Sequence, residues 1–117
     1  MPQNQAIAFD ALPGAVTAYL AAHRDHDTTA QLDLFAADAT VVDEGQTHTG
    51  TTAIAAWMGD ASVAYTYTIT PIAAERSGEE DYTVTQHLAG DFPGGTVDLR
   101  FRFSLGDGLI RHLVIEP

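Results

Sequence analysis

Residues 97–115, VDLRFRFSLGDGLIRHLVI, decide the fold class of this chain. Every second residue in the first half of this stretch is apolar: Val97, Leu99, Phe101, Phe103 and Leu105. This period of two is typical of a strand with one buried face. Gly106-Asp107-Gly108 follows, and glycine accepts the positive φ that a hairpin turn requires. The stretch therefore predicts an antiparallel hairpin, with residues 109–115 as its closing strand.

The same alternation extends upstream to about residue 64. Aromatic or apolar residues alternate with threonines over residues 65–70, and Pro71 then interrupts the ladder. Residues 82–89 alternate as well, and residues 90–95 supply a turn. Four long strands, adjacent in sequence and joined by turns, predict an antiparallel meander with one face against helices. The pattern leaves open which strand face would line a pocket.

The first half of the chain is helical in period. Asp10 suits the N-cap of a helix with Pro13 in its first turn. One face of that helix then carries Leu12, Val16, Tyr19, Leu20 and His23. We expect a second helix over residues 29–36, a strand over residues 38–43, a polar loop over residues 44–50 and a third helix from Thr51. Helices followed by strands indicate an α+β domain.

Charge and composition bound the partners and the location. The chain has 16 Asp+Glu against 5 Lys+Arg, all of them arginine, and a formal charge of −11. Such a field repels phosphate backbones and anionic lipid, so we expect neither nucleic acid nor a membrane surface as a partner. The 117 residues suffice for one domain, 1–117, with about residues 1–9 as an N-terminal tail. Since cysteine, a signal-peptide pattern and a long apolar run are all absent from the sequence, we expect a cytoplasmic protein.

Three stretches taken together resemble one known family. Residues 34–43 (LFAADATVVD), 53–57 (AIAAW) and 101–110 (FRFSLGDGLI) are similar to the nuclear transport factor 2-like superfamily, above all to its SnoaL-like members. The resemblance covers roughly residues 10–116. It implies a cone-shaped, curved and mainly antiparallel sheet on three helices, the cystatin-like arrangement, which encloses a pocket; it also implies a homodimer. The superfamily includes ketosteroid isomerases, polyketide cyclases and epoxide hydrolases, but also non-catalytic modules, so the fold does not fix the function.

Asp43 is the sharpest catalytic candidate. In ketosteroid isomerases the general base is an aspartate at the end of the first strand, and Ala39-Thr40-Val41-Val42-Asp43 reproduces its Ala-Thr-Val-x-Asp context. The resemblance also places the oxyanion-hole tyrosine of those enzymes at Tyr19 on the first helix. A poorly hydrated carboxylate can take up a carbon-bound proton, and a phenol opposite it can donate a hydrogen bond to the enolate oxygen that develops. The alternative is that Tyr19 is a core aromatic residue and Asp43 merely ends a strand.

The resemblance fails at the second oxyanion acid, an aspartate on the penultimate strand of ketosteroid isomerases. That position is Phe101 or Arg100 here, and neither is a carboxylic acid. Asp98 shares its strand face with Arg100 and Arg102, which indicates a surface row of ion pairs. Losing one of two donors weakens enolate stabilisation by a few kcal/mol. A steroid isomerase is therefore disfavoured, while acid–base chemistry on another small molecule remains.

Histidines and aromatic residues supply the remaining candidates. His87 is a second acid–base candidate if its strand face looks into the cone, and His48 follows Asp43 in the next loop; the alternative for both is a solvated surface position. We expect the pocket wall or the core to include Trp57, Met58, Tyr65, Tyr67 and Phe101. His23, His26 and Asp27 have the spacing of metal ligands, but histidines also suit a solvated helix end, so we expect no metal.

These patterns predict a small-molecule pocket protein. No phosphate-binding glycine loop and no nucleophilic serine elbow occurs in the sequence, and we expect no cofactor. The first hypothesis is a cofactor-independent acid–base enzyme for a small apolar carbonyl or epoxide compound, with Asp43 as base and Tyr19 and His87 as donors. The second is a non-catalytic module that binds a ligand or dimerises through its open sheet face.

Overall fold

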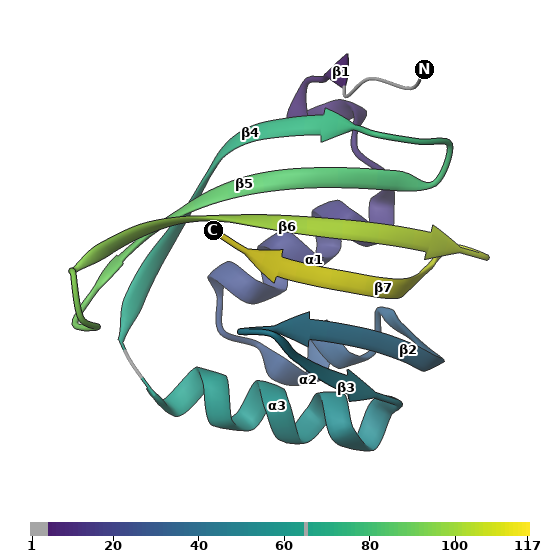
Figure 1. Cartoon of the computed structure of the whole chain (residues 1–117). Helices are drawn as coiled ribbons and strands as arrows, with labels where there is room; N and C mark the ends of the chain where they lie inside the picture. Colours follow the sequence, from purple (N-terminus) through teal and green to yellow (C-terminus); the bar gives the residue numbers. More distant parts are fainter. Residues whose placement is uncertain (1–4, 65) are drawn as a thin grey trace.

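The computed structural model describes residues 5–64 and 66–117, without the side chains of residues 60–64. Within these residues a curved, seven-stranded sheet packs against three α-helices (Figure 1). The strands are β1 (Gln5–Ala6), β2 (Phe35–Asp43), β3 (Gln46–Thr49), β4 (Tyr67–Arg76), β5 (Asp81–Gly90), β6 (Thr96–Gly106) and β7 (Leu109–Glu116). The helical elements are the 3-10 turn η1 (Phe9–Ala11), α1 (Gly14–Arg24), α2 (Thr28–Leu32) and α3 (Thr51–Ala64). The predicted α+β class is confirmed.

Strands β4 to β7 form the predicted antiparallel meander within the sheet order β1-β4-β5-β6-β7-β2-β3. Strand β2 joins this meander by pairing in parallel with β7, so that Phe35 lies beside Ile110 and Asp43 beside Ile115. This pairing attaches the helical half of the chain to the strand half. Pro71 does not end β4, because the register shifts between Pro71 and Ala73 and the pairing with β5 then continues.

The expected boundaries in the first half need four corrections. Helix α1 begins at Gly14, with Pro13 at the N-cap position, and Asp10 lies in η1 instead. The second helix ends at Leu32, and Phe35 belongs to β2, because backbone pairing with β7 extends that strand toward its start. The expected polar loop contains β3, which forms a hairpin with β2. Residues Gln5–Ala6 of the expected tail pair with the end of β4.

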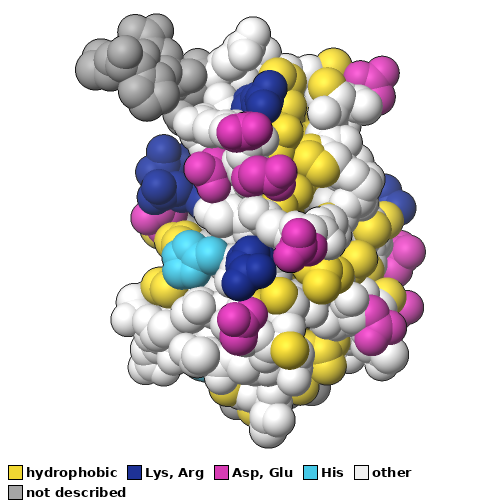
Figure 2. All heavy atoms as spheres, turned by 90° about the vertical axis from the view of Figure 1, so that its right-hand side faces the viewer, with side chains coloured by type: hydrophobic (Ala, Val, Ile, Leu, Met, Phe, Trp, Pro, Cys, Tyr) yellow, Lys and Arg dark blue, Asp and Glu magenta, His cyan; other side chains and the backbone are white. Residues whose placement is uncertain are grey.

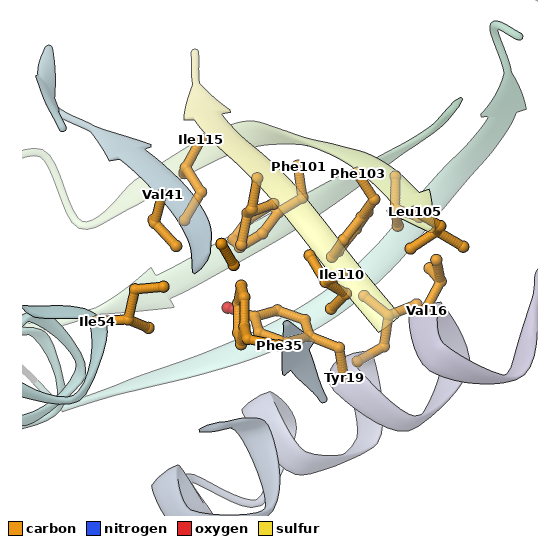
Figure 3. Packing of buried hydrophobic residues seen from close by; sticks show 14 of the residues in the cluster. Val16, Tyr19, Phe35, Val41, Ile54, Phe101, Phe103, Leu105, Ile110 and Ile115 are labelled. Atoms are coloured by element: carbon orange, nitrogen blue, oxygen red, sulfur yellow. The ribbon is translucent and has the colours of Figure 1, made fainter. Parts of the chain in front are cut away.

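The core lies between α1 and the inward face of the sheet. Figure 3 shows Phe101 and Phe103 of β6 pointing toward Tyr19 of α1. The ring of Tyr19 meets that of Phe103 edge to face at a centroid distance of 5.4 Å and that of Phe35 at 6.0 Å. Such edge-to-face pairs add to the stabilisation from burying the rings. The alternation read in residues 97–105 therefore predicted the inward face of β6 correctly.

Arginine side chains lie among acidic ones on the surface. Figure 2 shows this mixture, with hydrophobic atoms between, at the end of the molecule that carries the β4–β5 and β6–β7 turns. Four arginines make ion pairs: Arg24 with Asp25, Arg100 and Arg102 with Glu116, and Arg111 with Asp38. The fifth, Arg76, donates to the carbonyls of Gly78 and Glu79. Among the helices described, none has both the length and the apolar character needed to cross a bilayer.

Candidate active site

A cavity of about 760 Å³ lies between the helices and one end of the curved sheet. A volume of this size suits a small organic molecule. The residues that line it are Tyr19, His23, His26, Thr28, Gln31, Asp43, Glu44, Gly45, Trp57, Met58, Tyr67, Leu88, Phe92, Pro93, Thr96, Val97, Leu99, Phe101, Ile115, Glu116 and Pro117. They come from α1, α2 and α3, from strands β2, β4, β5, β6 and β7 and from the connections between elements, and most of them are apolar or aromatic. Six of the nine candidates expected from the sequence are among them: Asp43, Tyr19, Trp57, Met58, Tyr67 and Phe101.

Asp43 reaches the cavity because β2 ends there in a tight hairpin. Glu44 and Gly45 both have positive φ, 53° and 75°, as a two-residue turn of this hand requires. The turn places Asp43 opposite Gln46 of β3, while its other side pairs with Ile115 of β7. Strands on both sides thus hold the backbone of Asp43. The residue is half-buried and lines the cavity.

Trp57 of α3 fixes the orientation of this carboxylate. Its indole Nε1–H donates a hydrogen bond of 3.0 Å to Oδ2 of Asp43. Within the described part of the chain no hydrogen bond to Oδ1 is present, so this second oxygen can receive a proton or hold a water. Met58, the next residue of α3, is buried and lines the same wall.

Tyr19 presents a neutral phenol to the cavity. The side chain is 1% exposed, and Figure 3 shows it crossing the core from α1 toward Val41 and Ile54. Burial raises the pKa of Tyr19 far above its usual value, and the nearby Tyr67 and Asp43 raise it further. Burial and the charge of Asp43 likewise raise the pKa of Tyr67. Both phenols therefore stay protonated at neutral pH and can act as hydrogen-bond donors.

His23 also lines the cavity, and the sequence analysis gave it no role there. It lies one helical turn after Tyr19, with ring centroids 5.7 Å apart, and its ring also packs on Phe101 at 5.4 Å. Burial lowers the pKa of His23 to about 4, and the neighbouring His26 acts in the same direction, so the imidazole is neutral at neutral pH. Its place on the apolar face of α1 was the signal that could have identified it.

The connection between α1 and α2 closes the cavity beside Tyr67. His26 has a positive φ of 55°, and its ring meets that of Tyr67 edge to face at 5.2 Å. Asp27 then caps α2 by accepting a hydrogen bond of 3.0 Å from the backbone N–H of Ala30. The histidines and the aspartate that looked like metal ligands thus have other roles. Among the side chains described, those of residues 5–59 and 66–117, no group of three ligating residues that could hold a metal ion is found.

Three other candidates are not part of the cavity wall as described. His87 was a candidate only if its strand face looked into the cone, and the structure has the alternative. Val84 and Leu88 face inward, and His87 lies on the outer face, where its Nδ1 is 2.6 Å from Oδ1 of Asp98. His48 does not line the cavity either, because its ring stacks beside Trp57 at a centroid distance of 6.0 Å. Tyr65 lies outside the described residues.

The lining is acidic where it is charged. Its acidic residues are Asp43, Glu44 and Glu116, of which Glu116 has its carboxylate paired with Arg100 and Arg102, and no arginine is among the residues that line the cavity. Because the protein has no lysine, an anionic ligand would find no cationic side chain in this wall. The arrangement suits a neutral, mostly apolar molecule with a hydrogen-bonding group.

No protein-family model and no curated protein matches the sequence. Solved structures do match. A provisionally assigned polyketide cyclase of Sinorhizobium meliloti is 35% identical, with a TM-score of 0.87 over 94% of this chain and 100% of that chain. A protein with a ketosteroid isomerase-like fold from Catenulispora acidiphila, in complex with trimethylamine, is 26% identical, with a TM-score of 0.78 over 90% of this chain and 85% of that chain.

A Mycobacterium tuberculosis protein in complex with estradiol-17β-hemisuccinate is 21% identical. Its TM-score is 0.71 over 86% of this chain and 88% of that chain. At that level of identity the similarity shows a shared fold, not a shared ligand.

Proposed function

This chain belongs to the nuclear transport factor 2-like superfamily, and from that premise we propose that it is a cofactor-independent acid–base enzyme for a small apolar carbonyl compound. One observation carries the proposal. The Asp43 carboxylate, held by Trp57 at 3.0 Å, lines the same mostly apolar cavity as the protonated phenol of Tyr19. A base and a hydrogen-bond donor on different walls of one cavity are what proton abstraction beside a carbonyl requires.

The proposed reaction begins when Asp43 takes a proton from the carbon next to the carbonyl. The electron pair of that C–H bond moves into a new C=C bond, and the carbonyl oxygen becomes an enolate oxygen. Tyr19 donates a hydrogen bond to this oxygen and stabilises its charge. Return of the proton to another carbon gives an isomer. Alternatively, the enolate carbon attacks a second carbonyl group and closes a ring; the C=O π bond of that group becomes an alkoxide, which takes the proton back from Asp43. With an epoxide substrate, Asp43 would instead position and deprotonate a water.

The cavity supports a neutral and mainly apolar substrate. Its wall is formed by side chains such as Leu88, Leu99 and Phe101, and its charged groups are acidic. A carboxylate or phosphate on the substrate would be repelled by Asp43 and Glu44. Similar folds hold estradiol-17β-hemisuccinate and trimethylamine in their solved complexes, which supports binding of a small organic molecule in such a cavity.

The second candidate is a non-catalytic protein that binds such a ligand. It is favoured by the lack of the second oxyanion acid, since Phe101 is a buried, pocket-lining aromatic residue at one of the two aligned positions. In that case Asp43 and Tyr19 would bind polar groups of the ligand without transferring a proton.

Deuterium exchange separates the two candidates without knowledge of the natural substrate. A panel of apolar cyclic ketones is incubated with the protein in D₂O, and loss of the proton signal beside the carbonyl is followed by NMR. We expect the wild-type protein to catalyse exchange. Asp43→Asn should exchange at least about 100-fold more slowly, because a general base usually contributes that much to the rate. The asparagine keeps an oxygen that can accept the Trp57 hydrogen bond, so the fold should be retained.

Asp98→Asn is the matched control, because it makes the same chemical change on the outer sheet face. It should leave exchange unchanged. Equal rates for wild type and Asp43→Asn would remove Asp43 as the base. Ketone binding without any exchange would favour the non-catalytic candidate.

The homodimer and the cytoplasmic location remain predictions. The outer face of β5 and β6 is polar, with the His87–Asp98 pair and the Arg100 and Arg102 contacts to Glu116. A dimer through this face would be held by polar contacts and would therefore weaken in salt. Light scattering at low and high salt measures the mass directly, and a monomer at every concentration would contradict the dimer.

A further inference from the structure

We infer that His23 is a second hydrogen-bond donor of the cavity, and that its Nε2–H binds the same ligand oxygen as the Tyr19 hydroxyl. This inference rests on the proposed small-molecule site, and it specifies the ligand: a neutral molecule with a carbonyl oxygen that reaches the α1 wall. The family resemblance gives this position no role, and the second donor it would lead one to expect, on β6, is absent.

Helix geometry brings the two side chains together. Tyr19 and His23 are four residues apart on α1, so they share one face of the helix, and their ring centroids are 5.7 Å apart. Both line the cavity. Phe101 packs against both rings, at 6.5 Å from Tyr19 and 5.4 Å from His23. One acceptor oxygen in the cavity can therefore meet two donors from the same helix.

The two nitrogens of His23 have different surroundings. Nδ1 is sealed from solvent and has no hydrogen-bond partner among the residues described. Nε2 is not among the sealed atoms and has no hydrogen bond to a described residue, and because His23 lines the cavity, we infer that Nε2 is the nitrogen on the cavity side. Orphaned N–H donors are rarer inside proteins than unsatisfied acceptors. We therefore assign the single proton of the neutral ring to Nε2, where a ligand can use it.

The surroundings of His23 keep the ring neutral. Its neighbours are Tyr19, Tyr67 and Phe101, and the nearby His26 disfavours a second positive charge. A neutral imidazole donates a hydrogen bond without giving up its proton to the developing oxyanion. Together with Tyr19 it would supply two neutral donors opposite the Asp43 carboxylate.

The first test uses the ligand-free protein. Proton–nitrogen correlation NMR of histidine-labelled protein identifies which ring nitrogen carries the proton, and His23→Phe assigns the signal. We expect a neutral ring with its proton on Nε2 at pH 7 and still at pH 5.5. A proton on Nδ1, or a doubly protonated ring at pH 5.5, would overturn the inference whatever the protein catalyses.

The second test measures donation to an oxyanion. The probe is para-nitrophenol, whose absorbance distinguishes phenol from phenolate, and the background is Asp43→Asn, which removes the opposing charge. We expect this variant to bind the phenolate and to lower the pKa of the bound probe. Adding His23→Phe should weaken phenolate binding at least about 10-fold, because a hydrogen bond to a charged group is lost while the ring volume is kept.

His87→Phe in the same background is the matched control, because that histidine lies on the outer face. This substitution should leave the phenolate affinity and the pKa of the bound probe unchanged. Equal affinity and equal bound-probe pKa with and without His23→Phe would overturn the inference. Failure of Asp43→Asn to bind the probe at millimolar concentration would also overturn it, since two neutral donors should hold a phenolate once the carboxylate that acts on Tyr19 is removed. None of these outcomes depends on proton exchange, so failure of the proposed enzyme activity remains a separate result.

Discussion

The indole nitrogen of Trp57 lies 3.0 Å from Oδ2 of Asp43, so that one residue of α3 fixes the carboxylate at the end of β2. The two residues are 14 positions apart in the sequence, and the hairpin of β2 and β3 lies between them. This hydrogen bond connects the helical layer to the sheet at the cavity wall. It also decides which carboxylate oxygen remains available to a substrate.

Trp57→Phe should therefore misorient Asp43 while preserving an aromatic wall. Removal of the N–H leaves a half-buried carboxylate oxygen unsatisfied, which should lower the free energy of unfolding by about 1 to 3 kcal/mol. Exchange activity should fall as well, because the base is no longer held in one orientation. Urea denaturation and ketone exchange measure the two effects. In the Asp43→Asn background, Trp57→Phe should lower the free energy of unfolding by less than it does in wild type. Full additivity of the two substitutions would argue against a direct coupling.

Gly90 and Gly59 should respond in opposite directions to alanine. A Cβ at Gly90 would overlap the carbonyl oxygen of Thr66 and lie 2.6 Å from Cβ of Tyr67. Gly90→Ala should therefore displace the start of β4 and destabilise the protein by about 1 to 3 kcal/mol. At Gly59, inside α3, a Cβ meets no described neighbour within 4 Å, and alanine should stabilise the helix by about 0.5 to 1 kcal/mol. Thermal unfolding of both variants checks the signs, and a shift in the same direction for both would be a contradiction.

The strand half was predicted well, because the alternation that marks each strand lies within a few neighbouring residues. The alternation over residues 97–105 assigned Phe101 and Phe103 to the buried face, and both are at most 2% exposed. The boundary near Phe35 was different. The short apolar run at residues 34–37 fits a helix or a strand equally well, and the choice depends on pairing with Ile110, far along the chain.

The site was predicted in part. Asp43 and Tyr19 came from the family resemblance, since no local pattern specifies that a strand end and a helix face meet across a cavity. The face of His87 was left open because both faces of its strand alternate, and the apolar pair Val84 and Leu88 was the guide to the inward side. Gln86 of that strand is fully buried with no partner for its amide among the described residues, and no sequence pattern predicts such a position.

His23 should make stability depend on pH. The folded protein keeps the ring neutral down to a pKa of about 4, whereas an unfolded chain protonates it near the ordinary value of 6.5. Between these values the unfolded state binds more protons, so stability is complete above about pH 6.5 and falls as pH decreases toward 4. At pH 4.5 the loss from this residue should be about 2 to 3 kcal/mol.

His23→Phe removes this contribution and should flatten the decline by that amount. Urea denaturation of wild type and variant at pH 7 and pH 4.5 gives the difference, in which the carboxylates shared by both proteins largely cancel. His112→Phe, which leaves His23 in place, should keep the wild-type decline. Parallel curves for wild type and His23→Phe would show that His23 is protonated in the folded protein.

Tyr19→Phe should separate the catalytic hydroxyl from the structural ring. The ring is 1% exposed and packs on Phe35 and Phe103, and phenylalanine preserves those contacts. The hydroxyl has no hydrogen bond to any described residue, so its removal should change the free energy of unfolding by less than about 1 kcal/mol. Loss of a donor to the enolate oxygen should nevertheless lower exchange about 100-fold or more.

Tyr82→Phe provides the matched comparison for this last variant. Tyr82 lies near the far end of β5, outside the cavity lining, where Arg76 covers its ring at 5.9 Å. Losing its hydroxyl should leave both stability and exchange close to wild type. If Tyr19→Phe kept full exchange activity, the oxyanion would be stabilised without Tyr19. If Tyr19→Phe lost stability and Tyr82→Phe did not, the Tyr19 hydroxyl would have a structural role. The comparison is direct, because both substitutions remove a hydroxyl from a partly or wholly buried ring.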